Sequence, residues 1–150
     1  MSCRPLIPDP GPNPSPSRRP LKRDPPKHCC QVAPFPIPEV MRHINAFALG
    51  CRSRFAGCVV KVAWVGSWHH GEAEAAVAHY MWNEEGCDVI SQGTDTVHAH
   101  LVYKSYGGLS IGYNSNAREF VGDTVLTAPL LRWEAIYAPF VSSLLNQSWE

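Results

Sequence analysis

The sequence of 150 residues contains no long apolar run. Because a membrane-spanning helix needs about 18 or more consecutive apolar residues, no transmembrane segment is predicted. The first thirty residues have no apolar core of the kind found in secretory signal peptides, so no signal peptide is expected. Cys3 has no hydrophobic segment before it, so it is not expected to be a lipid anchor. The sequence leaves the compartment of the protein open.

Catalytic and cofactor-binding signatures are also scarce. The sequence has no P-loop and no Gly-x-Gly-x-x-Gly fingerprint, so it predicts neither a phosphate-binding loop nor a dinucleotide cofactor. The paired carboxylates of Glu84 and Glu85 fall at the end of a predicted helix, where solvation accounts for them. No nucleophile with a partner base stands out. An α/β enzyme is therefore the least favoured class, and no catalytic residue or cofactor is predicted.

Metal and disulfide signals are weak. None of the six cysteines forms a Cys-x-x-Cys pair, so neither a zinc knuckle nor a redox pair is indicated. Cys51 and Cys87 occupy apolar-patterned positions, where free buried thiols are the default expectation. Disulfides stay open, because their formation depends on the compartment.

Histidines occur as His69-His70 and as His98-x-His100. A zinc site needs further ligands in a suitable geometry. Helical positions 98 and 100 point about 200° apart and do not easily share an ion. We expect exposed helix histidines and no metal site.

Charge and proline are unevenly distributed. Residues 1–28 hold nine of the fourteen prolines and six Lys or Arg against two Asp, so this segment carries +4 and the rest −4. Such a segment buries too little apolar surface to offset the entropy of ordering the chain, so we expect a disordered tail with polyproline character. A basic tail can contact nucleic acid or anionic lipid. An unstructured leader is the favoured interpretation, and no nucleic-acid partner is predicted.

From residue 29 onward, apolar patterns typical of strands and helices alternate. The spacing predicts strands at about 29–34, 59–65, 88–92, 109–113 and 124–127, and helices at about 38–53, 71–85, 95–106 and from Ile136 to Leu145. Asp95 is a candidate N-cap, Gly107-Gly108 should end the third helix, and Pro139 should kink or break the last one. Alternating strands and helices predict an α/β fold, a parallel sheet with helices on both faces.

Six short motifs follow one another in this part of the chain. They are Phe35-Pro36-Ile37-Pro38-Glu39-Val40, Gly66-Ser67-Trp68, Glu85-Gly86-Cys87-Asp88-Val89-Ile90, Gln92-Gly93-Thr94-Asp95-Thr96, Ile111-Gly112-Tyr113-Asn114-Ser115-Asn116 and Leu126-Thr127-Ala128-Pro129. With these motifs in this order, residues 31–150 resemble the basic membrane protein family, the purine-nucleoside-receptor-type solute-binding components of ABC transporters. The resemblance implies one lobe of a type I periplasmic-binding-protein fold.

The resemblance also implies a partial domain. Residues 29–150 look like the second of two lobes that close on a ligand, without the lobe that supplies the other wall. One wall cannot exclude water from a ligand, so weak binding is expected. The implied partners are a small purine or nucleoside and a separate first lobe or an ABC permease, and the exposed cleft face favours self-association. The family is exported and membrane-associated, which contrasts with the expected lack of a signal peptide.

Candidate ligand contacts are the residues that follow each strand, because ligands of parallel sheets bind beyond the carboxyl ends of the strands. They are Phe35, Trp68, Gly93, Thr94, Asp95, Asn114, Asn116 and Trp133. Structural alternatives stay open. Trp68 can pack beneath a loop, Asp95 can cap a helix, and Trp133 can open the last helix. The asparagines suit a turn.

The resemblance assigns roles to some of these residues. It implies that Trp68 stacks on a purine ring and that Trp133 lies near the cleft. At the position of Asn116 the family has an acidic residue that bonds ribose hydroxyls, and an amide loses that charge-assisted bond. The family's lysine near Leu131 is absent, and the loop after Trp68 is altered. These departures leave the identity of the solute open.

Two hypotheses about function follow. The first is a solute-binding lobe without catalysis, which stacks a ring on Trp68 and makes polar contacts through Thr94, Asp95, Asn114 and Asn116. The alternative is a truncated remnant that acts as a structural or protein-interaction module with no ligand. The aromatic residues favour the first hypothesis, and the missing lobe favours the second.

Overall fold

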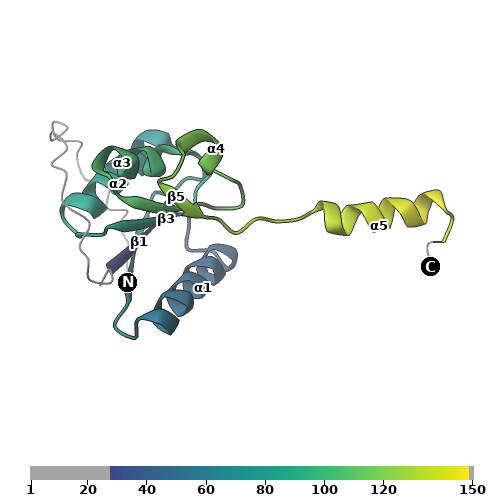
Figure 1. Cartoon of the computed structure of the whole chain (residues 1–150), viewed down its shortest axis with the longest axis horizontal. Coiled ribbons are helices and arrows are strands. Elements are labelled where there is room, and N and C mark those ends of the chain that lie inside the picture. The colour runs from purple at the N-terminus through teal and green to yellow at the C-terminus, as the bar shows by residue number, and fades with distance from the viewer. Residues whose placement is uncertain (1–27, 149–150) are drawn as a thin grey trace.

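The computed structural model describes residues 28–148, and Figure 1 shows how their helices and strands are arranged. The disordered tail predicted for residues 1–28 lies, apart from His28, outside the described residues. The described part opens directly with the first strand of a sheet.

Five parallel strands form one sheet in the order β2-β1-β3-β4-β5. The strands are β1 (His28–Ala33), β2 (Val59–Trp64), β3 (Val89–Gln92), β4 (Leu109–Ile111) and β5 (Val125–Thr127). The helices are α1 (Pro38–Arg54), α2 (Gly71–Asn83), α3 (His98–Tyr106), α4 (Arg118–Val121) and α5 (Glu134–Leu145). The predicted α/β fold with a parallel sheet is confirmed, while the short helix α4 was not predicted.

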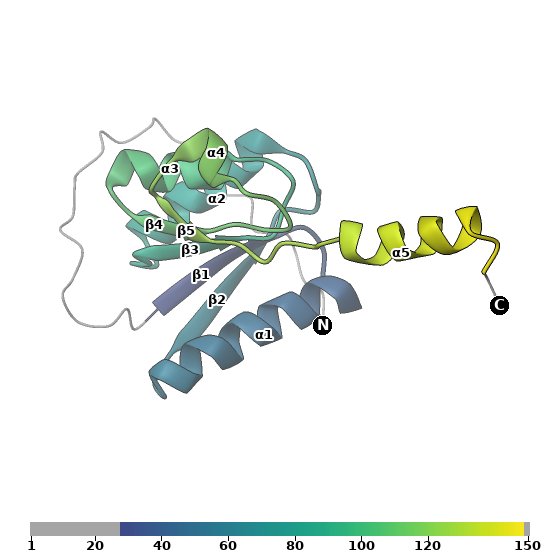
Figure 2. The ribbon, with the colours of Figure 1, turned by 45° about the vertical axis from the view of Figure 1, so that its right-hand side comes forward.

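Helices cover both faces of the sheet, as predicted. α1 lies along one face, and α2, α3 and α4 lie on the other (Figures 1 and 2). Side chains alternate along β1, so Cys30 and Val32 enter the larger core with α2 and α3, whereas Ala33 joins the smaller core with α1. Because helices pack on both of its faces, β1 is buried along almost its whole length.

The first and third helices have the predicted end signals. Pro38 and Glu39 stand in the first turn of α1, where a missing N–H costs nothing and a negative charge is favourable. α3 ends at Gly107, whose φ of +75° is left-handed. A Cβ at Gly108 would lie 2.5 Å from the ring of Trp82, so the helix end packs closely on α2. The predicted stop at Gly107-Gly108 is confirmed.

One helix prediction is wrong, and the break that was one of two alternatives at Pro139 does not occur. Asp95 does not cap α3, which begins at His98 with Val97 as its N-cap residue. The segment before His98 is held outside the helix because the side chains of Thr94 and Thr96 hydrogen-bond elsewhere. Pro139 does not break α5, which runs continuously from Glu134 to Leu145. The proline removes one backbone donor, and the helix continues on both sides of it.

The cysteines differ from the expectation of free thiols. Cys30 of β1 forms a disulfide with Cys87, and Cys51 of α1 forms one with Cys58. The Cα atoms of the two pairs are 5.9 Å and 6.0 Å apart, within the range that disulfides span. Pairing of β1 with β3 brings Cys30 to Cys87 across 57 residues of sequence, a proximity that local spacing cannot reveal. Cys29 is the free cysteine among the described residues.

α5 stands apart from the sheet in both views, and none of its residues is buried (Figures 1 and 2). It exposes the large apolar side chains Ile136, Tyr137, Phe140, Val141, Leu144 and Leu145. Just beyond β5, an isolated parallel bridge between Asn114 and Leu130 extends the pairing before the chain leaves the sheet. No helix within residues 28–148 is both long and apolar enough to cross a membrane.

Candidate functional site

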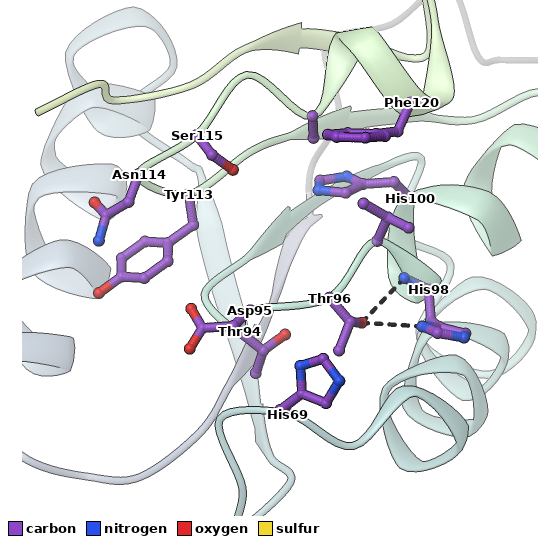
Figure 3. A pocket seen from close by; sticks show the side chains of 12 residues that line it. His69, Thr94, Asp95, Thr96, His98, His100, Tyr113, Asn114, Ser115 and Phe120 are labelled. Carbon is purple, nitrogen blue, oxygen red and sulfur yellow. Dashed lines mark hydrogen bonds between the residues drawn. The ribbon is translucent and has the colours of Figure 1, made fainter.

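A pocket of about 570 Å³ opens at the carboxyl ends of β3 and β4 (Figure 3). Loops that follow three strands meet there, together with the first turn of α3 and part of α4. The lining residues are His69, Thr94, Asp95, Thr96, Val97, His98, His100, Tyr113, Asn114, Ser115, Ala117 and Phe120. The position agrees with the rule that places ligands beyond the carboxyl ends of parallel strands.

An aromatic cluster of Phe35, Trp68 and Tyr113 adjoins the pocket. The ring of Trp68 is stacked with that of Tyr113, at 6.3 Å between centroids and 23° between planes, and Phe35 meets Trp68 edge-on at 6.3 Å. The Tyr113 hydroxyl donates a hydrogen bond to Glu39 Oε1 at 3.3 Å. The pKa of this phenol is raised, mainly by burial and to a lesser extent by the negative charge of Glu39. Tyr113 belongs to both groups, so it joins the aromatic cluster to the pocket.

Glu74 of α2 is fully buried and anchors one wall of the pocket. Its Oε2 accepts hydrogen bonds from the hydroxyls of Thr94 (2.7 Å) and Thr96 (2.6 Å) and from the side-chain amide of Gln92 (3.3 Å). Its Oε1 accepts one from the backbone N–H of His70 at 3.2 Å. These donors offset the cost of burying a carboxylate. They also use the threonine protons, so the Thr94 oxygen is left as an acceptor only, while the Thr96 oxygen already accepts from the backbone N–H of His98 at 3.2 Å.

Two buried polar atoms in the pocket wall have no hydrogen-bond partner. Nδ1 of His100 is one of them, and this side chain is only 2% exposed. The other is Oδ1 of Asn114, a residue held at a left-handed φ of 55°, which asparagine tolerates better than most residues. Burial lowers the pKa of His100 from 6.5 to about 4, so its ring is neutral near pH 7. Buried polar atoms are normally paired, so both atoms call for an explanation.

The charge of the lining restricts what the pocket can hold. None of the twelve lining residues is Lys or Arg, and Asp95 contributes an exposed carboxylate. An anionic ligand would therefore find no side-chain cation to neutralise it. The rings of Tyr113 and Phe120 supply apolar surface on the lining (Figure 3). The arrangement suits an uncharged ring with hydrogen-bonding groups.

The structure brings five of the predicted ligand contacts together at this edge of the sheet. Thr94, Asp95 and Asn114 line the pocket. Phe35 and Trp68 lie in the aromatic cluster beside it. The backbone N–H of Asp95 donates to the Trp68 carbonyl at 2.8 Å, which ties the loops after β2 and β3 to each other.

The other three predicted contacts lie elsewhere. Gly93 packs against β1, since a Cβ at this position would lie 3.1 Å from the carbonyl oxygen of Val32. The side chain of Asn116 donates to Glu119 Oε1 at 3.1 Å on the exposed side of the next loop. Trp133 stacks on Tyr137 at the start of α5, with 5.7 Å between ring centroids.

Sequence reasoning missed Tyr113, His100 and Phe120. Tyr113 follows the fourth strand, which ends at Ile111 rather than at the predicted residue 113, so a correct strand end would have included it. His100 contradicts the expectation of exposed helix histidines, because it lies at the edge of the buried stripe of α3. Phe120 is on α4, for which no periodic pattern was available.

His70 and the clustered cysteines have structural roles. His70 accepts a hydrogen bond from the backbone N–H of Ala73 at the start of α2. Within residues 28–148, the group of three His, Cys, Asp or Glu side chains close enough to hold a metal is Cys29, Cys51 and Cys58. The disulfide between the last two leaves a single thiol in that group.

The string Gly108-Leu109-Ser110-Ile111-Gly112 matches the Gly-x-Ser-x-Gly pattern of nucleophile elbows, in which the serine sits on an exposed turn between a strand and a helix. Ser110 instead lies in the middle of β4, is fully buried, and donates its hydroxyl to the Thr124 carbonyl at 3.3 Å. The string therefore lacks the geometry of an elbow.

Comparisons with known proteins agree on one family. The family model described as ABC transporter substrate-binding protein PnrA-like matches residues 29–150. The chain is 40% identical over 119 residues to a putative ABC transporter glucose-binding protein of Haloferax volcanii, covering 79% of this chain and 30% of that protein. It is 34% identical over 119 residues to a purine-binding protein of Brucella abortus, covering 79% and 34%. The chain thus spans about a third of the length of these relatives.

A solved structure supports the fold. The crystal structure of a transcriptional activator of the comK gene from Bacillus halodurans superposes on the chain with a TM-score of 0.66. The match covers 83% of this chain and 43% of that one at 23% sequence identity, which shows the fold alone.

Proposed function

Because the chain belongs to the family of PnrA-like ABC transporter substrate-binding proteins, we propose that it supplies one wall of a site that binds an uncharged purine or nucleoside without catalysis. The observation that carries the proposal is the pocket at the carboxyl ends of β3 and β4, with the aromatic cluster at its side. Its lining has acceptors and aromatic rings and lacks a cation, which suits a neutral heterocycle.

A planar ring would stack on the aromatic cluster and turn its polar edge toward the pocket. Base–aromatic stacking contributes about 1–3 kcal/mol per base in nucleic-acid binders. Trp68 either receives the ring directly or supports Tyr113, which faces the pocket. Asp95 and Asn114 would accept hydrogen bonds from the ligand, and the Thr94 oxygen adds a further acceptor.

The names of the relatives limit the possible solutes only in part. One is named for glucose and one for purine, and both ligands are uncharged rings with several hydrogen-bonding groups. Stacking favours the purine, because both faces of a purine are flat and aromatic. The other wall would come from a first lobe, and delivery of the solute would require an ABC permease. The pocket of this chain alone is open to water, so we expect affinities in the millimolar range.

Titration of the full chain with adenine, adenosine, inosine, guanosine and glucose tests the proposal. Ligand-observed NMR suits millimolar affinities. We expect binding of at least one purine compound and a loss of about 1–3 kcal/mol in Trp68→Ala. Trp133→Ala is the matched control, since this tryptophan stacks on Tyr137 outside the pocket.

Two results would contradict this assignment. Absence of any binding at millimolar concentration would remove the receptor role for this chain and favour the alternative, a structural or interaction module. If Trp68→Ala binds the ligand with unchanged affinity, the stacking on Trp68 is refuted, but the binding function is not. The Tyr113→Ala variant would then show whether the pocket-facing ring carries the contact.

A further inference from the structure

His100 and Asn114, in the pocket wall, each have an unpaired buried polar atom, whereas two neighbouring buried polar side chains are paired. Glu74, the buried carboxylate next to it, has four hydrogen-bond donors. Tyr103, one helical turn after His100 on α3, donates its hydroxyl to the Cys87 carbonyl at 3.1 Å. His100 has no such partner although it is almost completely buried. A buried polar atom without a partner costs about 1–3 kcal/mol.

Other unpaired buried atoms do not face this space. They are Nδ1 of His28 and the side-chain oxygens of Gln31 and Gln92, and none of these residues lines the pocket. Both residues line the pocket, and Figure 3 shows them at opposite ends of the lining, His100 beneath Phe120 and Asn114 beside Tyr113. Two unpaired atoms thus coincide with two aromatic rings around one open volume.

The chemistry of these two groups determines which hydrogen-bonding groups a ligand must present to them. The amide oxygen of Asn114 only accepts hydrogen bonds. A neutral imidazole donates at one ring nitrogen and accepts at the other. The nearby carboxylate of Asp95 and the absence of Lys and Arg from the lining exclude a favourable site for phosphate.

We propose that His100 and Asn114 are specificity-determining residues that bind opposite edges of an uncharged, amino-bearing nucleobase. This inference rests on the proposed function and adds the residues that determine which ligand is preferred. An amino N–H of the base is donated to the Asn114 oxygen, and a ring nitrogen or N–H on the opposite side of the base pairs with the imidazole of His100. A nucleotide is disfavoured against its base because its phosphate finds no cation in the lining.

Three compounds and two variants of the full chain test the inference. Adenine carries the amino group, unsubstituted purine lacks it, and adenosine monophosphate adds charge. Binding is measured by ligand-observed NMR, and the His100 ring signals are followed in ¹H–¹³C spectra. The variants are His100→Leu and Asn114→Gly, since glycine accepts the left-handed φ of position 114. Leu101→Ala is the control, because this exposed residue of α3 does not line the pocket.

We expect adenine to bind wild-type protein about tenfold more tightly than purine, since one hydrogen bond of this kind contributes about that factor. Adenine should shift the His100 ring signals. Each variant should lose about tenfold in affinity for adenine, and Asn114→Gly should bind the two bases alike. The melting temperature of His100→Leu should stay the same or rise, because an unpaired buried polar group is removed. A histidine with only a structural role would instead lose stability on replacement.

The outcomes separate the inference from the proposed function. Failure of wild-type protein to bind any of the three compounds overturns this inference, and the proposed function falls with it only if adenosine, inosine and guanosine also fail to bind. Binding of adenine that both variants leave unchanged, with no shift of the His100 signals, overturns this inference alone. Preferred binding of adenosine monophosphate would likewise overturn it. Weaker binding of adenine in His100→Leu and loss of the preference for adenine in Asn114→Gly, with Leu101→Ala unaffected, support it.

Discussion

The sheet with α1 to α4 and the C-terminal arm, residues 128–148, both contain helices with an apolar stripe, yet only the first region buries it. α1 places Val40, Ile44 and Ala48 in the core, whereas α5 buries no residue. The loop after α1 returns the chain to β2, so the stripe meets the sheet, but the chain after β5 leads away from it. Helical spacing therefore predicts a helix, and burial depends on a surface that the spacing does not specify.

The helix of the arm has little intrinsic stability. A helix of 12 residues is marginal in water without packing, and Pro139 removes one of its backbone donors. The sheet region gains its stability from burial on both faces. The comparison predicts that equal substitutions have very different effects in the two regions.

A matched pair of isoleucines gives the largest expected contrast. Ile90 of β3 is fully buried, and Ile136 of α5 is 62% exposed. We expect Ile90→Ala to lower the free energy of unfolding by about 2–5 kcal/mol, because it leaves a cavity in the core. Ile136→Ala should change it by less than about 0.5 kcal/mol. Urea unfolding followed by circular dichroism measures both, and similar losses in the two variants would show that α5 is packed in solution.

The same contrast explains how much the sequence could predict. The strands, the parallel sheet and the end of α3 at Gly107 follow from local periodicity and glycine chemistry, and they were predicted. Disulfide partners such as Cys30 and Cys87 depend on which strands become neighbours. Asp95 lies outside α3 because its neighbours Thr94 and Thr96 donate hydrogen bonds to Glu74, which lies about 20 residues earlier in the sequence. Long-range contacts of this kind leave no local pattern.

The candidate site was predictable to the same extent. Thr94, Asp95 and Asn114 follow strands and line the pocket, so the strand-end rule found them. His100 was missed because its surroundings come from α4 and the loop after β4, which only the tertiary fold brings to α3. Trp133 follows the last strand too, but the chain has already left the sheet there.

The two disulfides provide a second test within the sheet region. The Cys30–Cys87 bond closes 57 residues, whereas the Cys51–Cys58 bond closes only 7. In the chain-entropy model the longer loop contributes about 4 kcal/mol and the shorter about 2.5 kcal/mol. Replacing both cysteines of a pair by alanine should therefore destabilise more for Cys30 and Cys87. Chemical denaturation of the two double variants measures the difference, and the reverse order would show that loop closure is not the main contribution.

Acid should destabilise the sheet region through His100. Burial lowers the pKa of this imidazole from 6.5 to about 4 in the folded protein. The unfolded chain therefore binds a proton at a higher pH than the folded protein does. Stability should be unaffected above about pH 6.5, fall as the pH drops to about 4, and lose no more from this group below that. The shift corresponds to a loss of roughly 3 kcal/mol at most.

Thermal unfolding across this pH range measures the effect. His100→Leu should give a flatter profile, and a His98→Gln variant serves as the control because His98 is exposed on the same helix. An unchanged profile in His100→Leu would assign the acid sensitivity to other groups. His79, whose pKa burial also lowers, would be the next to test.

Removal of the arm should have the smallest effect on stability. A chain that ends at Leu130 keeps the bridge to Asn114 and every strand, and none of the described residues that it loses is buried. We expect its unfolding free energy to stay within about 0.5 kcal/mol of that of the full chain. Circular dichroism should show that a peptide of residues 131–148 is largely unfolded in water, because a short helix without a packing surface is marginal. A large loss of stability in the shortened chain would mean that the exposed apolar face of α5 packs against the sheet region or a second copy in solution, and the distinction between the two regions would then be wrong.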